Sequence, residues 1–105
     1  MTQAEMMETM ELVFSECDAL RAAGQQEYAH TQSNSFANFE RLADDLDMDR
    51  KAVLWVYAMK HRDGIAAHIK GHKSQRENVR GRINDLIVYL CLLRGMVDEE
   101  EKTNG

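Results

Sequence analysis

Residues 80–96, RGRINDLIVYLCLLRGM, form the most apolar segment of the chain. At about 100° per residue, one face of a helix through this segment carries a row of aliphatic side chains: Val79, Ile83, Leu86, Ile87 and Leu90. This spacing predicts a helix that faces a core. The opposite face would be polar on a surface helix, but here it carries Gly81, Asp85, Val88 and Leu92, with Tyr89 beside them. We therefore expect this helix to be central in the fold and covered on two sides.

A single small chain has little protein left to cover both sides of a central helix. The two-sided apolar pattern therefore predicts a homodimer in which a second copy covers the second face. We expect Leu92, Val88 and Trp55 to contact the partner.

Asp85 is the acid inside this apolar segment. An ion buried alone is too costly, so its carboxylate must be paired, hydrogen-bonded or functional. Gly81, one turn earlier, has no side chain and lets a backbone or a ligand come close. Asp63 shares a face with apolar residues of the preceding helix, and we expect it to pair with Asp85 or with an arginine. A structural partner of Asp85 would be Arg62 or Arg82.

Composition predicts the fold class and excludes several functions. The chain has 105 residues, no proline and 44% hydrophobic residues, which favours one all-α domain with the packing of a four-helix bundle. A formal net charge of −5 argues against general nucleic-acid binding, which needs a basic surface. No apolar run approaches the roughly 18 residues of a membrane span, and residues 2–16 are too acidic for a signal peptide. We expect a cytoplasmic protein in which Cys17 and Cys91 are buried, reduced thiols.

The first half of the chain predicts two helices and a loop. Thr2 and Glu5 form a capping box, and Gly24 is expected to end the first helix. Its stripe predicts core packing rather than an adaptable methionine surface: Met6, Met10, Val13, Cys17 and Leu20. Residues 25–35 are polar and non-periodic, which indicates a loop, and Ser35 is expected to cap a short second helix.

The second half predicts two longer helices and a tail. Asp47 or Asp49 is expected to cap a helix over residues 50–70 that ends at Gly71. One face of this helix is predicted to be a core stripe: Ala52, Val56, Met59, Asp63 and Ala66. The domain should comprise residues 1–96, followed by a flexible acidic tail at residues 97–105.

A basic segment precedes the last helix. His72, Lys73, Arg76, Arg80 and Arg82 lie within eleven residues, and Ser74 with Glu77 forms a second capping box. A helix N-terminus among arginines can bind an anion. The alternative is that these cations pair with acids of the first two helices.

The order of several motifs resembles a known family. A loop with Tyr28 is followed by NSFANFERLA, which contains Asn38 and Phe39, then by MKHRD with Lys60, and finally by RINDLIVYLCLL, in which Asp85 precedes an aliphatic-tyrosine run. Over residues 20–94, this order resembles small all-α bacteriophage proteins related to the MazG-like nucleotide pyrophosphohydrolases and to phage nucleotide-modification-associated domains.

The resemblance implies a site and a chemistry. MazG-like enzymes bind magnesium through carboxylates of neighbouring helices and hydrolyse a nucleoside triphosphate to the monophosphate and pyrophosphate. The implied metal ligands here are Asp85 and Asp63, with Glu40 as a third catalytic acid and Glu27 as a loop contribution. The implied substrate-binding residues are Lys60, Arg80, Arg82, Tyr28 and Asn38.

The sequence also departs from the family pattern. The last helix should offer two acids one turn apart, yet Gly81 and Arg82 stand where the second acid belongs, and the second helix lacks a paired ExxE. Two expectations follow. The chain is a phage nucleotide-binding protein with a degenerate metal site, and any activity it has is magnesium-dependent pyrophosphohydrolysis. Alternatively, it is a non-enzymatic interaction protein that inhibits a host enzyme or defence complex in the host cytoplasm, because acidic charge can occupy a basic cleft.

Overall fold

Four α-helices and one π-helical turn make up the regular structure of the computed structural model, which describes residues 1–29, 33–73 and 78–104. The elements are α1 (Gln3–Gly24), a π-helical turn (Gln25–Ala29), α2 (Ala37–Leu46), α3 (Arg50–Ile69) and α4 (Val79–Asn104). No strand occurs in the described ranges, so the predicted all-α fold is confirmed. None of the described helices is long and apolar enough to cross a membrane.

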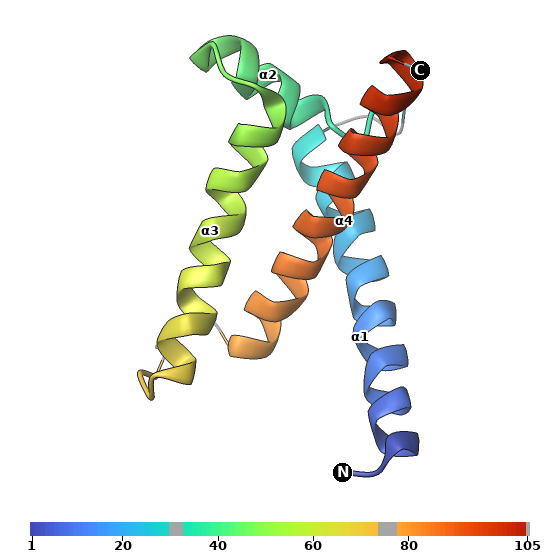
Figure 1. Cartoon of the computed structure of the whole chain (residues 1–105), viewed down its shortest axis with the longest axis vertical. Helices are drawn as coiled ribbons and strands as arrows, with labels where there is room; N and C mark the ends of the chain where they lie inside the picture. The colour runs from blue at the N-terminus through green and yellow to red at the C-terminus, as the bar shows by residue number, and fades with distance from the viewer. Residues whose placement is uncertain (30–32, 74–77, 105) are drawn as a thin grey trace.

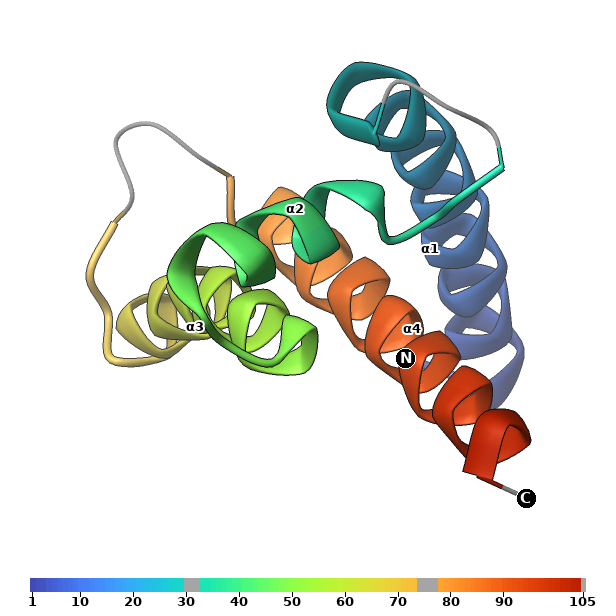
Figure 2. The ribbon, with the colours of Figure 1, turned by 90° about the horizontal axis from the view of Figure 1, so that it is seen from above.

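Helix α4 is central, as predicted. It contacts α3 on one side and α1 on the other, and α2 packs on α3. Figure 2 shows α4 between the other two long helices, with α2 across one side of the α3–α4 pair. In Figure 1 the long helices α1 and α3 lie on either side of α4, and the two chain ends lie at opposite ends of the molecule.

The start of α1 follows the predicted local chemistry, but its end does not. The Thr2 hydroxyl accepts a hydrogen bond from the Glu5 N–H at 3.1 Å, and the reciprocal bond completes the capping box. Beyond Gly24 the chain continues as the π-helical turn, so the predicted loop at residues 25–35 is wrong for its first five residues. The side chain of Gln25, the first residue of this turn, is buried and donates from its amide to the Asn34 carbonyl at 2.9 Å.

The ends of α2 and α3 depend on short polar side chains. Helix α2 begins after Phe36, one residue later than predicted from Ser35, and the Asn34 side chain accepts a hydrogen bond from the Phe36 N–H at 2.9 Å. Asp49 caps α3 by accepting from the Lys51 N–H at 2.7 Å, as predicted. Gly71, with φ of +95°, lies just past the end of α3 in the left-handed region that glycine tolerates.

Helix α4 differs from its prediction at both ends. It begins at Val79, where the Asn78 side chain accepts from the Arg80 N–H at 2.8 Å. The capping box expected at Ser74 and Glu77 lies outside the described residues. At its other end α4 continues through Asn104, where a flexible tail from residue 97 was expected.

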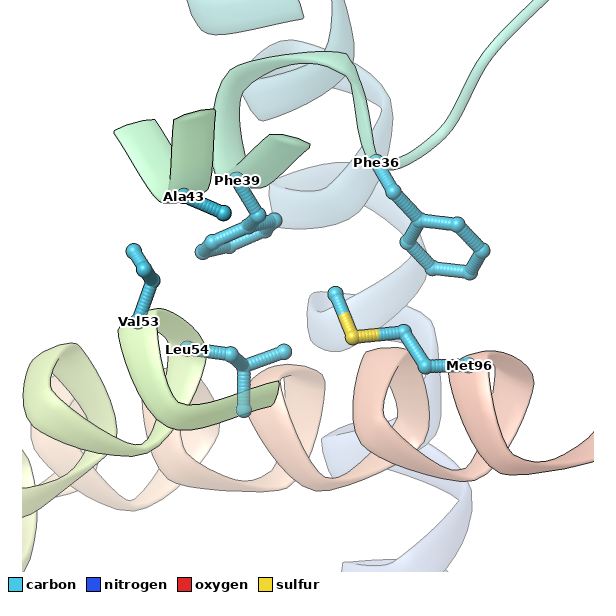
Figure 3. Packing of buried hydrophobic residues seen from close by; sticks show 6 residues of the cluster. All are labelled: Phe36, Phe39, Ala43, Val53, Leu54 and Met96. Atoms are coloured by element: carbon cyan, nitrogen blue, oxygen red, sulfur yellow. The ribbon is translucent and has the colours of Figure 1, made fainter. Parts of the chain in front are cut away.

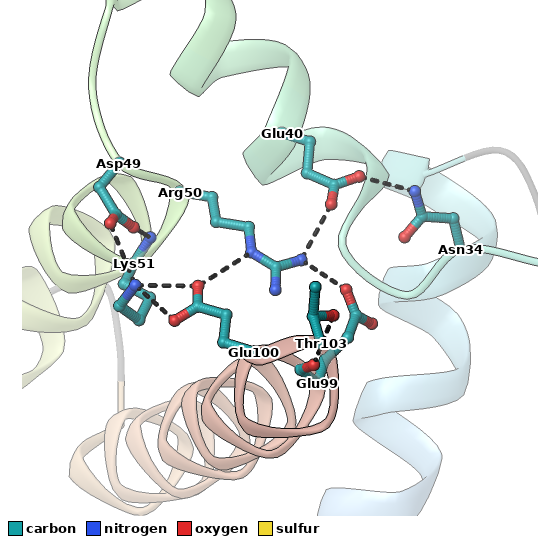
Figure 4. Close-up of polar contacts among 8 residues, drawn as sticks. All are labelled: Asn34, Glu40, Asp49, Arg50, Lys51, Glu99, Glu100 and Thr103. Atoms are coloured by element: carbon teal, nitrogen blue, oxygen red, sulfur yellow. Dashed lines mark hydrogen bonds and ion pairs between the residues drawn. The ribbon is translucent and has the colours of Figure 1, made fainter. Parts of the chain in front are cut away.

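Ion pairs explain why the end of α4 is helical. The Arg50 side chain, at the start of α3, contacts Glu99 at 3.1 Å and Glu40 of α2 at 2.9 Å. The neighbouring Lys51 contacts Glu100 at 2.9 Å. Figure 4 shows these side chains converging where α2, α3 and α4 meet. The acids of the expected tail therefore serve as partners for the cations of α3.

The core lies at the same junction. Leu54 of α3 and Met96 of α4 are fully buried. Figure 3 shows both within the cluster formed by Phe36, Phe39, Ala43, Val53, Leu54 and Met96. Tyr89, Leu92 and Leu93 of α4 pack against this cluster. The side of α4 that carries Asp85 thus faces the interior.

The predicted core stripe of α3 faces outward in the structure, and that of α4 is only partly buried. On α4, Ile83 and Leu90 are 39% and 46% exposed, although their row was expected to face the core. On α3, Val56 is 61% exposed, whereas the buried side chains are Val53, Leu54, Ala58 and His61. Both helices are apolar on two sides, and periodicity identifies such sides without indicating which one packs inside the chain.

Two further expectations are corrected by the burial pattern. Cys17 is buried as predicted, but Cys91 is exposed, and both thiols are free. In α1, the expected core methionines Met6 and Met10 are 41% and 40% exposed.

Candidate functional site

A cleft of about 470 Å³ lies between α1, the π-helical turn, α2, α3 and α4. This volume falls in the range of small-molecule sites. The lining combines apolar, aromatic and polar side chains: Leu20, Ala23, Gly24, Glu27, Asn38, Phe39, Leu42, Tyr57, Lys60, His61, Asp85 and Tyr89.

Aromatic rings form the floor of the cleft. Phe39 of α2 meets Tyr57 of α3 edge to face, with ring centroids 6.3 Å apart, and meets Tyr89 of α4 in the same way at 6.2 Å. The His61 ring stacks on Tyr89 with centroids 5.6 Å apart. Edge-to-face packing fixes these rings relative to one another. The floor therefore offers rigid aromatic surface to a ligand.

His61 and Asp85 form the polar centre of the cleft. The His61 Nδ1 atom lies 3.5 Å from the Asp85 Oδ2 atom, and the Asp85 side chain is 31% exposed. The expectation that Asp85 is paired is therefore confirmed, and one of its neighbours is His61, which was not among the partners predicted from the sequence. His61 is only 9% exposed, and its Nδ1 makes no hydrogen bond within the described ranges.

Lys60 and Asn38 extend the polar lining on either side of this pair. Lys60 comes from α3 and Asn38 from α2, and both were predicted to bind substrate. Arg82 lies behind Lys60, where its Nη1 donates to the Lys60 carbonyl at 3.4 Å. Its side chain packs on α3 against Gly64, where any larger residue would displace it. The cleft thus brings together Asp85, Lys60 and Asn38 and has Arg82 nearby.

The other predicted site residues lie elsewhere. Asp63 is 67% exposed and pairs with its neighbour Arg62 at 2.9 Å. Glu40 accepts hydrogen bonds from Arg50 and Asn34, both at distances under 3 Å, at the junction shown in Figure 4. Neither acid lines the cleft. Asp63 is misplaced because the stripe to which it belongs faces outward.

The expected magnesium ligands are consequently not assembled. Asp85, Asp63 and Glu40 belong to three separate polar environments. Within residues 1–29, 33–73 and 78–104, no group of three or more histidines, cysteines or acids is arranged to hold a metal ion. Of the four acids implied by the family resemblance, Asp85 and Glu27 line the cleft, whereas Asp63 and Glu40 do not.

The predicted anion site at the start of α4 is only partly described. Arg76, Ser74 and Glu77 lie outside the described residues. Arg80 is exposed in the first turn of α4, whereas Arg82 points toward α3. The backbone of Tyr28 belongs to the π-helical turn, and its side chain lies outside the described part of the structure.

Sequence reasoning did not assign His61 and Tyr57 to the site. Both lie on the buried side of α3, one turn apart, and they line the same cleft. Val53, Tyr57 and His61 follow one another at a spacing of four residues, which is a helical pattern. This pattern could have identified their shared face, but the stripe that contains Val56 and Met59 was more prominent.

Comparison of the chain with protein-family models, with curated proteins and with solved structures finds no match.

Proposed function

We propose that this chain binds a nucleotide in the cleft between α2, α3 and α4. The main support for the proposal is that one cavity is lined by three aromatic rings, by the His61–Asp85 pair and by Lys60. The order of motifs that resembles phage nucleotide enzymes supports the same ligand class and a cytoplasmic place of action.

The chemistry of the lining suits the two ends of a nucleotide. A base stacks on the faces of Tyr57 and Tyr89, since aromatic stacking accepts any base. Asn38 and the His61–Asp85 pair offer donors and acceptors to the base edge or the sugar. Lys60 supplies a cation to a phosphate, and charge-assisted contacts of this kind are the strong ones.

The separation of Asp63 and Glu40 from Asp85 supports binding without hydrolysis. Metal-dependent attack on a phosphate needs several oxygen ligands around one ion. Asp85 instead has an imidazole as its neighbour. Any magnesium would then arrive as the counter-ion of the triphosphate itself.

Calorimetry with the purified chain tests the proposal. A panel of nucleoside triphosphates, monophosphates and nucleosides is titrated with magnesium and, separately, with a chelator. We expect one triphosphate to bind more tightly than its nucleoside. Lys60→Ala should weaken triphosphate binding about tenfold or more and leave nucleoside binding unchanged. Lys70→Ala is the matched control, because Lys70 is exposed at the end of the same helix and does not line the cleft.

The same samples distinguish binding from catalysis. We expect no pyrophosphate release above background. Release that is abolished by Asp85→Asn would instead support the degenerate site as an active pyrophosphohydrolase. If no nucleotide binds, the proposed function is wrong.

The exposed first half of α1 favours a second candidate, a protein that binds and inhibits a host enzyme or defence complex. Met6, Met7, Met10, Leu12 and Phe14 are each at least 40% exposed. Methionine-rich surfaces suit binding to proteins. This candidate predicts that Met10→Glu abolishes inhibition of a defined host enzyme, whereas Lys60→Ala does not.

A further inference from the structure

The outward face of α4 carries a heptad pattern. Val79, Ile83, Leu86, Leu90, Leu93 and Val97 alternate at spacings of three and four residues. This is the a/d pattern of helices that pack against another helix along their length. Ile83, Leu90 and Val97 are 39%, 46% and 37% exposed, and the other members of the row are half-buried. No described helix of the same chain covers this row fully.

Helix α3 carries a second heptad row. Its members are Ala52, Trp55, Met59, Arg62, Ala66 and Ile69, again at spacings of four and three. Trp55 is 44% exposed and Ile69 is 78% exposed. Arg62 is the one charged side chain in the row. The row lies beside the buried positions of α3 and points out of the chain.

Both rows lie on the same side of the α3–α4 pair. Val53 and Tyr57 of α3 face α2, as do Leu92 and Met96 of α4. At about 100° per residue, the two heptad rows fall on the sides of their helices that point away from α2. Figure 2 shows that α2 covers one side of this pair and that the opposite side is open. The two rows together form one apolar surface, which we name the open face.

The exposed area of the chain is large for its size. The accessible surface is 7837 Å² and the radius of gyration is 15.6 Å. A folded monomer of this mass exposes about 6,000 Å², and a chain of this length has a radius of gyration of about 13 Å. The surplus exceeds the roughly 800 Å² that each partner buries in a standard interface. A second copy that packs on the open face would bury part of this surplus, to which the exposed apolar side chains of α1 also contribute.

We propose that two copies of this chain pack their open faces together, so that α3 and α4 of both copies form a four-helix bundle. Isologous pairing about a two-fold axis lets each apolar row meet a like row. The two α4 helices run antiparallel. In this arrangement Leu86 faces Leu90 of the partner subunit.

Charge along α4 supports the antiparallel direction. Its first turn carries Arg80 and Arg82, and its last turns carry Asp98 and Glu101 beside Glu99 and Glu100, which already pair with Arg50 and Lys51 of α3. A parallel pair would place the two acidic ends side by side, which is unfavourable. The antiparallel pair places each basic start near an acidic end and aligns the helix dipoles favourably.

The proposed dimer uses contacts that differ in part from those expected from the sequence. Val88 and Leu92, expected at the interface, line the groove between α1 and α4, and Leu92 packs on the core cluster. Trp55 belongs to the open face and stays in the proposed contact.

Sedimentation velocity at about 50 μM tests the pairing. The wild-type chain should sediment with twice the 12.1 kDa mass of one chain. Leu90→Glu should sediment as a monomer, because two carboxylates would enter the apolar seam. Val56→Glu is the matched control, since Val56 is more exposed than Leu90 but lies outside both heptad rows; it should remain a dimer. A wild-type monomer, or equal dissociation of the control, would overturn the proposal, provided that circular dichroism shows all variants to be helical.

Disulfide trapping tests the direction of the helices. In a Cys91→Ser background, one protein carries Leu86→Cys and another carries Leu90→Cys. Antiparallel packing predicts an intermolecular disulfide after the two proteins are mixed and none when either is alone. Self-linking of the Leu90→Cys protein would contradict the antiparallel arrangement. Because the cleft lies on the α2 side, nucleotide binding by monomeric Leu90→Glu separates this proposal from the proposed function.

Discussion

At the scale of single residues, Asp85 is the position on which the site depends most. Its carboxylate lies 3.5 Å from the His61 ring nitrogen, and its side chain is 31% exposed. We expect Asp85→Asn to lower the free energy of unfolding by about 1 kcal/mol, because partial exposure screens the lost pair. The same change should weaken nucleotide binding. Chemical denaturation and calorimetry measure the two effects, and a variant unchanged in both would show that Asp85 has neither role.

Asp49 should make the stability of the folded chain depend on pH in the acidic range. Hydrogen bonds from the Lys51 N–H and from its ammonium group lower the pKa of Asp49 from its ordinary value of 3.8. A carboxyl whose pKa is lower in the folded state contributes stability that is complete above its unfolded pKa. That stability is lost as the pH falls through the folded pKa.

Asp49→Asn tests this dependence. Asparagine caps a helix about as well as aspartate but does not titrate. We therefore expect the melting temperature of the variant to fall less than that of the wild type between about pH 5 and about pH 3. Parallel curves for the two proteins would show that Asp49 contributes no acid sensitivity.

At the scale of helices, Leu54 holds α3 against α2 and α4. It is fully buried in the cluster that also contains Met96. Leu54→Ala should cost about 2 to 5 kcal/mol, through lost burial and the cavity that remains. Leu46→Ala is the control, since Leu46 is 60% exposed at the end of α2 and should cost no more than about 0.5 kcal/mol. Equal losses in urea unfolding would show that the cluster is not the core.

Local chemistry explains which helix ends could be predicted from the sequence. The Thr2 capping box, the Asp49 cap and the stop at Gly71 depend on residues within one turn, and all three are confirmed. The π-helical turn after Gly24 begins at Gln25, whose side chain donates to the distant Asn34, a contact that periodicity does not reveal. The helical end of α4 likewise depends on cations of α3.

At the scale of the whole molecule, helix number and the central place of α4 were predictable, whereas the direction of each helix face was not. Val56 and Val53 lie three residues apart on α3, yet one is 61% exposed and the other is 3% exposed. Both positions are equally apolar, so the choice is made by partners distant in the sequence.

The candidate site, like the fold, could be predicted only in part from the sequence. Lys60, Asn38 and Asp85 share the cleft because their motifs lie on the sides of α2, α3 and α4 that pack together. Asp63 was assigned to the site on the assumption that its stripe faced inward, and the reversed orientation of α3 removes it. His61 was missed because the same reversal brings it inside.

The position of Met96 has a consequence for how the chain is made. The N-terminal part of a protein leaves the ribosome first, and a domain folds when all of its segments have emerged. Helix α4, which contacts both α1 and α3, emerges after α1, α2 and α3, and the fully buried Met96 lies in its second half. Until then, α1 through α3 have no central helix on which to pack, and the apolar side chains of α1 are accessible to other molecules in the cell. The core of these helices is therefore completed only after α4 has been made.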